Sequence, residues 1–106
     1  EAAAGIVALE KMIDRLREDH DNAMRLARGV TGIDGLSIDL AHVHTDIVYF
    51  EVVRDGLTAE ELVKRLDSRG VRMLSVGPKR IRAVTHYGIT ADDIQSAMLA
   101  LEDTMR

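Results

Sequence analysis

A short cationic segment offers the first candidate for chemistry: residues 79–82 hold a lysine and two arginines, directly after a Gly-Pro pair. Residues 80–86 have the composition of a strand, in which successive side chains point to opposite faces. Ile81 and Ala83 are the natural side chains for the buried face. Arg82 then points from mid-strand out of the other face, where its planar fork of donors would match a carboxylate or phosphate. From spacing alone, a solvated or salt-bridged surface arginine is the favoured interpretation.

The histidines are the second set of candidates. His42 and His44 have the spacing of a metal-binding pair, but zinc needs a third or fourth protein ligand, and the sequence places none. Exposed loop histidines are therefore the favoured interpretation. His20 falls on an apolar helical stripe and is predicted to be a partly buried core residue. His86 ends the arginine strand on the face of Arg82, where it would either line a site or terminate the sheet.

Nucleophilic catalysis finds little support in the sequence. Thr85 and His86, with Asp46 or Glu51, are the residue types of a catalytic triad of nucleophile, base and orienting group. Their spacing in the sequence does not support such a triad. No phosphate-binding loop, nucleotide fingerprint or paired-carboxylate motif is present. The residues alone thus provide one anion-facing arginine and no catalytic machinery.

Length and composition predict one ordinary globular domain. The chain has 106 residues, of which 46% are hydrophobic and 30% charged. A net charge of −4 argues against broad nucleic-acid binding. Cysteine is absent, which excludes disulfides and thiol chemistry, and no apolar run reaches the roughly 18–20 residues of a membrane span. We expect a cytoplasmic protein without nucleic-acid or membrane partners.

Three helices are predicted. An apolar stripe with alternating steps of four and three residues runs from Leu9 through Ile13 and Leu16 to Val30, which indicates one long helix. Glycines at 29, 32 and 35 are predicted to end it. Capping residues Thr58 and Thr90 mark the starts of two further helices.

Four strands complete the predicted fold, at residues 36–38, 46–53, 71–76 and 80–86. The last two are separated by a tight Gly-Pro turn and form a hairpin by spacing. The predicted order is α-β-β-α-β-β-α. This order indicates an α+β two-layer sandwich, with a mainly antiparallel sheet and helices on one face.

Several segments together resemble low-specificity L-threonine aldolases. Residues 9–27 resemble the long helix in the C-terminal part of these enzymes, and residues 2–6 resemble the alanine-rich segment before it. Thr45-Asp46-Ile47-Val48 is similar to the family's T-N-[IL]-[VL] strand, with aspartate where asparagine is usual. Arg82-Ala83-Val84-Thr85-His86 is similar to its R-x-V-T-H segment, and residues 89–93 to the polar start of its last helix. The similarity keeps its order over essentially the whole chain.

The resemblance implies the C-terminal small domain of a fold-type-I pyridoxal 5'-phosphate (PLP) enzyme, occupying residues 1–106. It implies a lyase that splits L-threonine or L-allo-threonine into glycine and acetaldehyde. The family's Schiff-base lysine and most cofactor contacts belong to a large domain, which the resemblance places outside this chain. The arginine of R-x-V-T-H holds the substrate α-carboxylate in the family, and that role falls on Arg82. The resemblance further implies a homotetramer, with the large domain as the partner of this one.

Two other functions remain open from the sequence. One is the small domain of another fold-type-I PLP enzyme, such as a β-eliminating lyase or a protein similar to serine hydroxymethyltransferase. The other is a free-standing regulatory module that binds a small anion on the Arg82 face. In the aldolase interpretation, we expect this chain alone to be inactive.

Overall fold

Three helices and one four-stranded sheet form the molecule, whose computed structural model describes residues 2–85 and 88–106, with side chains from residue 17 onward except His42. The predicted roles of His86 and of the Leu9, Ile13 and Leu16 side chains therefore lie outside the described residues. The elements follow in the order α1 (Ala2–Thr31), β1 (Leu36–Ser37), η1 (Leu40–His42), β2 (Ile47–Val52), α2 (Ala59–Asp67), β3 (Leu74–Ser75), β4 (Arg80–Val84) and α3 (Ala91–Met105). Apart from the short 3-10 helix η1, this is the predicted order.

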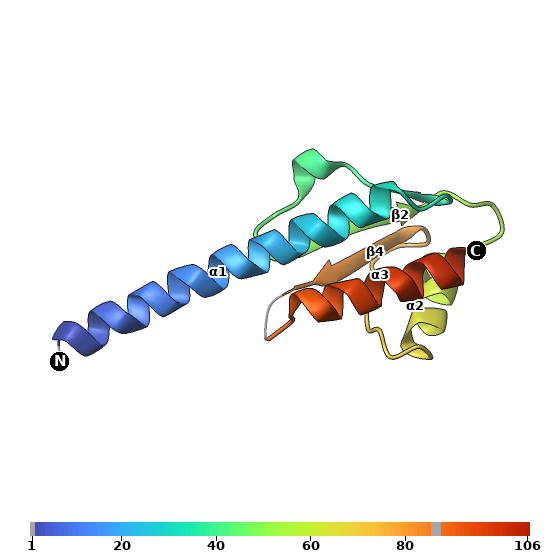
Figure 1. Ribbon diagram of the computed structural model, residues 1–106. Helices are drawn as coiled ribbons and strands as arrows, with labels where there is room; N and C mark the ends of the chain where they lie inside the picture. The colour runs from blue at the N-terminus through green and yellow to red at the C-terminus, as the bar shows by residue number, and fades with distance from the viewer. Residues whose placement is uncertain (1, 86–87) are drawn as a thin grey trace.

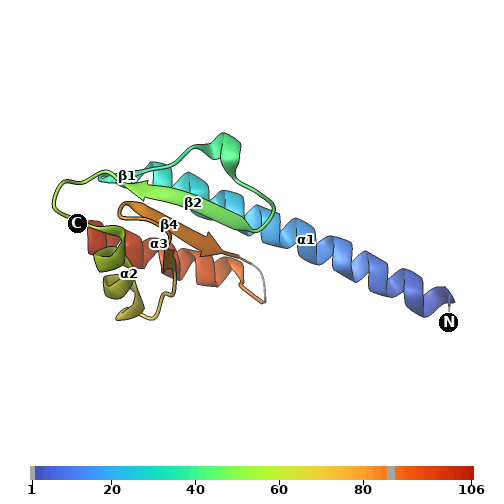
Figure 2. The ribbon, with the colours of Figure 1, turned by 180° about the vertical axis from the view of Figure 1, so that it is seen from behind.

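The sheet is antiparallel throughout, with strand order β1-β2-β4-β3. The long strands β2 and β4 lie at its centre, and α1 and α3 cover one face (Figure 2). On that face Val48, Phe50 and Ile81 are at most 1% exposed. The opposite face has no helix over it in the described part of the chain, and Leu74 and Val84 are exposed there. The predicted α+β sandwich with helices on one face is confirmed.

Helix α1 is much longer than the sheet that it covers. Its C-terminal half packs along the sheet, whereas its N-terminal half extends away from the other elements (Figure 1). The buried positions of the packed half are Asn22, Ala23, Leu26, Ala27 and Val30, together with Asp19. The prediction for His20 is wrong, because His20 is exposed. It lies roughly 90° around the helix from the centre of the buried stripe, since successive residues turn by about 100°.

Gly29 does not end α1 as predicted but lies inside it. A Cβ atom at this position would lie 2.2 Å from Cε and 2.3 Å from Sδ of Met98 on α3. The absence of a side chain thus lets the two helices approach closely. The helix ends at Thr31, and Gly35 in the following loop has φ +92°, a conformation that favours glycine.

The two shorter helices begin at the predicted caps. The Thr58 hydroxyl accepts a hydrogen bond from the backbone N–H of Glu61 at 3.1 Å. Thr90 and Asp93 form the reciprocal capping box, with distances of 3.1 Å and 2.9 Å. Helix α2 ends at Asp67, and the N–H of Val71 donates to the carbonyl of Leu66. Residue 71 therefore closes the helix instead of starting β3, which is shorter than predicted.

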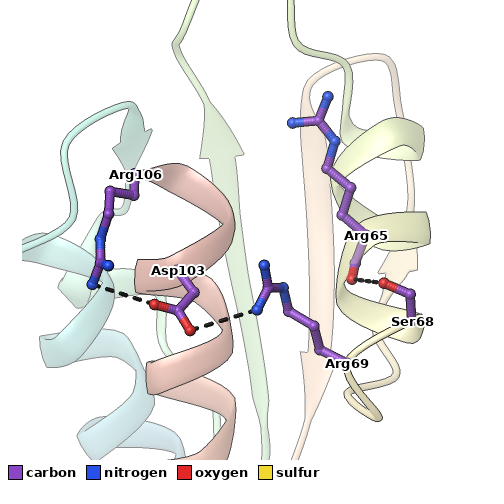
Figure 3. Close-up of polar contacts among 5 residues, drawn as sticks. All are labelled: Arg65, Ser68, Arg69, Asp103 and Arg106. Atoms are coloured by element: carbon purple, nitrogen blue, oxygen red, sulfur yellow. Dashed lines mark hydrogen bonds and ion pairs between the residues drawn. The ribbon is translucent and has the colours of Figure 1, made fainter.

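The C-terminal ends of α2 and α3 are linked by charged side chains. Asp103 on α3 forms ion pairs with Arg69, at 3.5 Å, and with Arg106, at 3.3 Å (Figure 3). The Ser68 hydroxyl donates to the carbonyl of Arg65 at 2.7 Å, and the guanidinium of Arg65 points away from this group. These contacts are largely exposed, so they contribute little to stability. No helix in the described residues is long and apolar enough to cross a membrane.

Candidate functional site

Arg82 lies at the middle of β4, on the open face of the sheet. The register places it directly opposite Tyr49 on β2 and Leu74 on β3. Its strand neighbours Ile81 and Ala83 are 0% and 4% exposed, whereas Arg82 itself is half-buried. The alternation predicted from the sequence is thus confirmed, and the arginine projects away from the helices.

The guanidinium of Arg82 has an unsatisfied donor. Its Nε atom is buried and has no hydrogen-bond partner, and the side chain makes no ion pair within residues 17–85 and 88–106. A buried donor without an acceptor is unfavourable, and more so when it carries charge. Arg82 is therefore a cation whose Nε has no acceptor among the described residues.

Arg80 and Tyr49 form a stacked pair beside Arg82. The Cζ atom of Arg80 lies 4.6 Å from the centroid of the Tyr49 ring, within the range of a cation–π contact. A surface hollow of about 210 Å³ adjoins the pair, between the loop at Asp39 and the Glu51 side of β2. Sequence reasoning assigned no role to Arg80, because the stack depends on the register between β2 and β4.

The polar residues near Arg82 in the sequence are structural. The Thr85 hydroxyl is buried and lies 2.9 Å from the carbonyl of Asp19 and 3.2 Å from that of Asp46, to which it donates. It thereby joins the end of β4 to α1. Thr85 thus faces the helices whereas Arg82 faces the other way, and His86, a member of the candidate nucleophile set, lies outside the described residues. Glu51 is an exposed residue on the open face.

Lys79 is an exposed residue of the turn between β3 and β4. Its ammonium group donates to the carbonyl oxygens of Leu57, at 2.6 Å, and Arg54, at 3.1 Å. Lys64, on α2, forms an exposed ion pair with Glu60 at 3.6 Å. Neither amine faces the open side of the sheet near Arg82.

The prediction of exposed loop histidines is confirmed at position 44. His44 is exposed, and the side chain of His42 lies outside the described residues. Among the side chains that are described, no group of three or more histidine or acidic residues is arranged to hold a metal ion.

Two plant proteins match the chain over nearly its whole length. Low-specificity L-threonine aldolase 1 of Arabidopsis thaliana is 34% identical over 113 residues, covering 98% of this chain and 31% of that protein. Probable low-specificity L-threonine aldolase 2 of the same plant is 35% identical over 101 residues, covering 94% and 28%. The chain is homologous to low-specificity L-threonine aldolases. It spans about a third of the length of these curated relatives, and no family model matches it.

Solved structures share the fold of this aldolase homologue. The cystine C-S lyase C-DES, in complex with its product cysteine persulfide, matches 85% of this chain with 24% of its own, with a TM-score of 0.74 and 21% identity. A variant of C-DES with glycine covalently linked to its PLP cofactor matches with a TM-score of 0.73. MppP, soaked with its product 2-ketoarginine, covers 90% of this chain with a TM-score of 0.69 and 16% identity. At 16–21% identity these structures show a shared fold, and the predicted fold class is confirmed.

Proposed function

We propose that this chain is the small domain of a PLP-dependent aldolase that cleaves L-threonine or L-allo-threonine to glycine and acetaldehyde. In this proposal Arg82 binds the α-carboxylate of the substrate. The observation that carries it is the unpartnered Nε of Arg82 on an open sheet face, in a chain homologous to threonine aldolases. An arginine fork binds a carboxylate with two parallel hydrogen bonds, and no described residue forms such a pair with Arg82.

The described lysines do not fit a covalent attachment point for PLP. The ammonium group of Lys79 donates hydrogen bonds to two carbonyl oxygens, and that of Lys64 forms an ion pair with Glu60. The side chain of Lys11 lies outside the described residues. When bound, PLP supplies the electron sink for the carbanion formed as the Cα–Cβ bond breaks. We assign its attachment to a large domain of the same enzyme, and we derive no step of the reaction from residues of this chain except substrate binding.

The contribution of Arg82 to such an enzyme is orientation. A carboxylate held by two hydrogen bonds to a guanidinium cannot rotate freely, and β4 fixes the backbone from which that guanidinium projects. Fixing the carboxylate limits the orientations of the adjacent Cα–Cβ bond. This lowers the entropic part of the barrier.

Replacing Arg82 by lysine in the full-length protein tests the proposal. Lysine keeps the charge but cannot form two parallel hydrogen bonds to a carboxylate. We expect kcat/KM for L-threonine to fall by the factor that corresponds to a loss of about 2–4 kcal/mol of transition-state stabilisation. Acetaldehyde release measures the reaction, and the visible absorbance of bound PLP should be unchanged. The exposed Arg65, on α2, provides the matched control, and Arg65→Lys should leave kcat/KM unaltered.

Two results would contradict the proposal. If Arg82→Lys retained wild-type kcat/KM, or lost PLP instead of substrate affinity, Arg82 would not be the carboxylate-binding residue. If the wild-type protein converted L-threonine to a 2-oxo acid and ammonia without acetaldehyde, the enzyme would be an eliminating lyase.

A further inference from the structure

Tyr49 carries an aromatic ring directly opposite Arg82 on the open face. Directly opposite residues in antiparallel strands have Cβ atoms about 4.5–5.5 Å apart, and the register pairs Tyr49 with Arg82. Tyr49 is half-buried although no helix of the described chain covers this face. Its neighbours on the same face therefore cover it, and Arg80 is one of them, stacked on the ring.

Arg80 and Arg82 are two like charges on one face of one strand. They are two residues apart, so without a further interaction both guanidinium groups would extend over the same region and repel each other. The ring of Tyr49 attracts the Arg80 guanidinium through its negative face. This contact holds Arg80 on the ring and leaves Arg82 as the arginine that is free to bind an anion.

The burial of Arg82 indicates which of its nitrogens face a ligand. Nε is buried, whereas the two terminal Nη atoms are not among the buried unpartnered atoms. The side chains best placed to enclose Nε are the directly opposite residues, Tyr49 and Leu74. Leu74 is 50% exposed whereas Tyr49 is half-buried, so we expect Tyr49 to be the residue that encloses Nε. If Tyr49 encloses Nε, the two terminal Nη atoms remain accessible to the carboxylate of a substrate.

We propose that Tyr49 is a positioning residue for Arg82, which it encloses on one side while Arg80 holds the ring in place. The inference rests on the proposed role of Arg82 in carboxylate binding. Tyr49 does not touch the reacting atoms; it acts by limiting the rotamers of Arg82, so that the terminal nitrogens are aimed before substrate arrives. The aromatic ring is the active part, and the phenolic hydroxyl is dispensable.

The test uses the full-length enzyme with Tyr49→Ala and Tyr49→Phe, assayed with L-threonine and with L-threoninamide, which lacks the carboxylate. Tyr49→Ala should raise KM for L-threonine roughly 3- to 30-fold, the range that corresponds to loss of a cation–π-sized interaction. Its kcat for L-threonine should fall as well, because a carboxylate that is held less firmly leaves the Cα–Cβ bond less well oriented. KM for the amide should not change. Tyr49→Phe keeps the ring and should restore wild-type values.

Arg80→Gln is a second variant, for the case that Tyr49→Ala does not fold. It keeps Tyr49 but removes the cation stacked on its ring. It should raise KM for L-threonine in the same direction and by a smaller factor. An unchanged KM for L-threonine in the folded Tyr49→Ala protein, or in Arg80→Gln if that alone folds, would overturn the inference. An equal rise for threonine and its amide would also overturn it, because the effect would then not pass through the carboxylate.

The inference and the proposed function fail in different ways. If Arg82→Lys has no effect on kcat/KM, the carboxylate assignment fails, whatever the Tyr49 variants do. If Arg82→Lys is impaired but Tyr49→Ala is not, the assignment holds and the positioning role of Tyr49 is wrong.

Discussion

At the scale of single residues, two cations of the 79–82 segment differ: Lys79 bonds the backbone of the fold, and Arg82 has no acceptor among the described residues. Lys79 donates to the carbonyl oxygens of Leu57 and Arg54 and so joins the β3–β4 turn to the loop after β2. The backbone strengthens this junction, because the carbonyl of Pro78 accepts from the N–H of Ala59 at 2.8 Å. Arg82, three residues later, has no such partner in the described chain. The junction anchors the start of the strand that presents Arg82.

Replacing Lys79 by methionine should therefore destabilise the fold. The change keeps the length of the side chain but leaves two carbonyl groups without their donor, at a cost of about 1–2 kcal/mol in the free energy of unfolding. Lys64→Met removes only an exposed pair with Glu60 and should cost a few tenths of a kcal/mol at most. Urea unfolding of the two variants compares them. Equal stabilities would show that the Lys79 hydrogen bonds contribute nothing measurable.

The face of Arg82 follows from the sequence, but its lack of a partner does not. Alternation with Ile81 and Ala83 fixes which way the side chain points, because only one face of so small a sheet is buried. Whether an acceptor lies nearby depends on which residues of β2 and β3 are opposite, and this register is a long-range property. Tyr49 and Leu74 are opposite, and neither is a carboxylate. The same reason explains why the Arg80–Tyr49 stack was not predicted.

At the scale of elements, the contact between α1 and α3 depends on Gly29. The side chain of Met98 occupies the space that a Cβ atom at position 29 would require. The sequence predicts this glycine at the end of the helix, because a glycine near the last apolar position of a helical stripe is typical of a helix end. The caps at Thr58 and Thr90 were predicted correctly because capping is local, within four residues. The role of Gly29 is fixed by a residue 69 positions away.

A double-mutant cycle measures this contact. In a Met98→Ala background the space is vacant, so Gly29→Ala should stabilise the protein by about 0.5–1 kcal/mol through helix propensity. With Met98 present, the new methyl group must displace the thioether, and Gly29→Ala should be less favourable by about 0.5–3 kcal/mol. The same effect of Gly29→Ala in both backgrounds would mean that Met98 yields without cost.

At the scale of the whole molecule, the sheet buries one face and leaves the other open. Leu74, Val76 and Val84 are exposed, and α1 extends beyond the elements that it packs against (Figure 1). The chain also spans about a third of the length of its plant relatives. We assign the open face to the large domain of the proposed enzyme. The homotetramer implied by the resemblance stays a prediction.

This chain by itself should neither cleave L-threonine nor form a Schiff base with PLP. Lys64 and Lys79 are engaged as described above, and neither lies beside Arg82. Borohydride reduction of a mixture of the chain with PLP, followed by peptide mapping, tests the prediction. A stoichiometric adduct on one lysine would contradict it, whereas sparse labelling of several lysines would agree with it.

The most direct test of the account asks whether Arg82 senses the substrate carboxylate. In the full-length enzyme, kcat/KM is measured for L-threonine and for L-threoninamide, with wild type and with Arg82→Gln. The wild type should have a higher kcat/KM for L-threonine than for L-threoninamide. In Arg82→Gln the free-energy difference that corresponds to this ratio should shrink by about 2–4 kcal/mol, as expected when a charge-assisted bidentate pair is removed. The same ratio of acid to amide in both proteins would show that Arg82 does not bind the carboxylate.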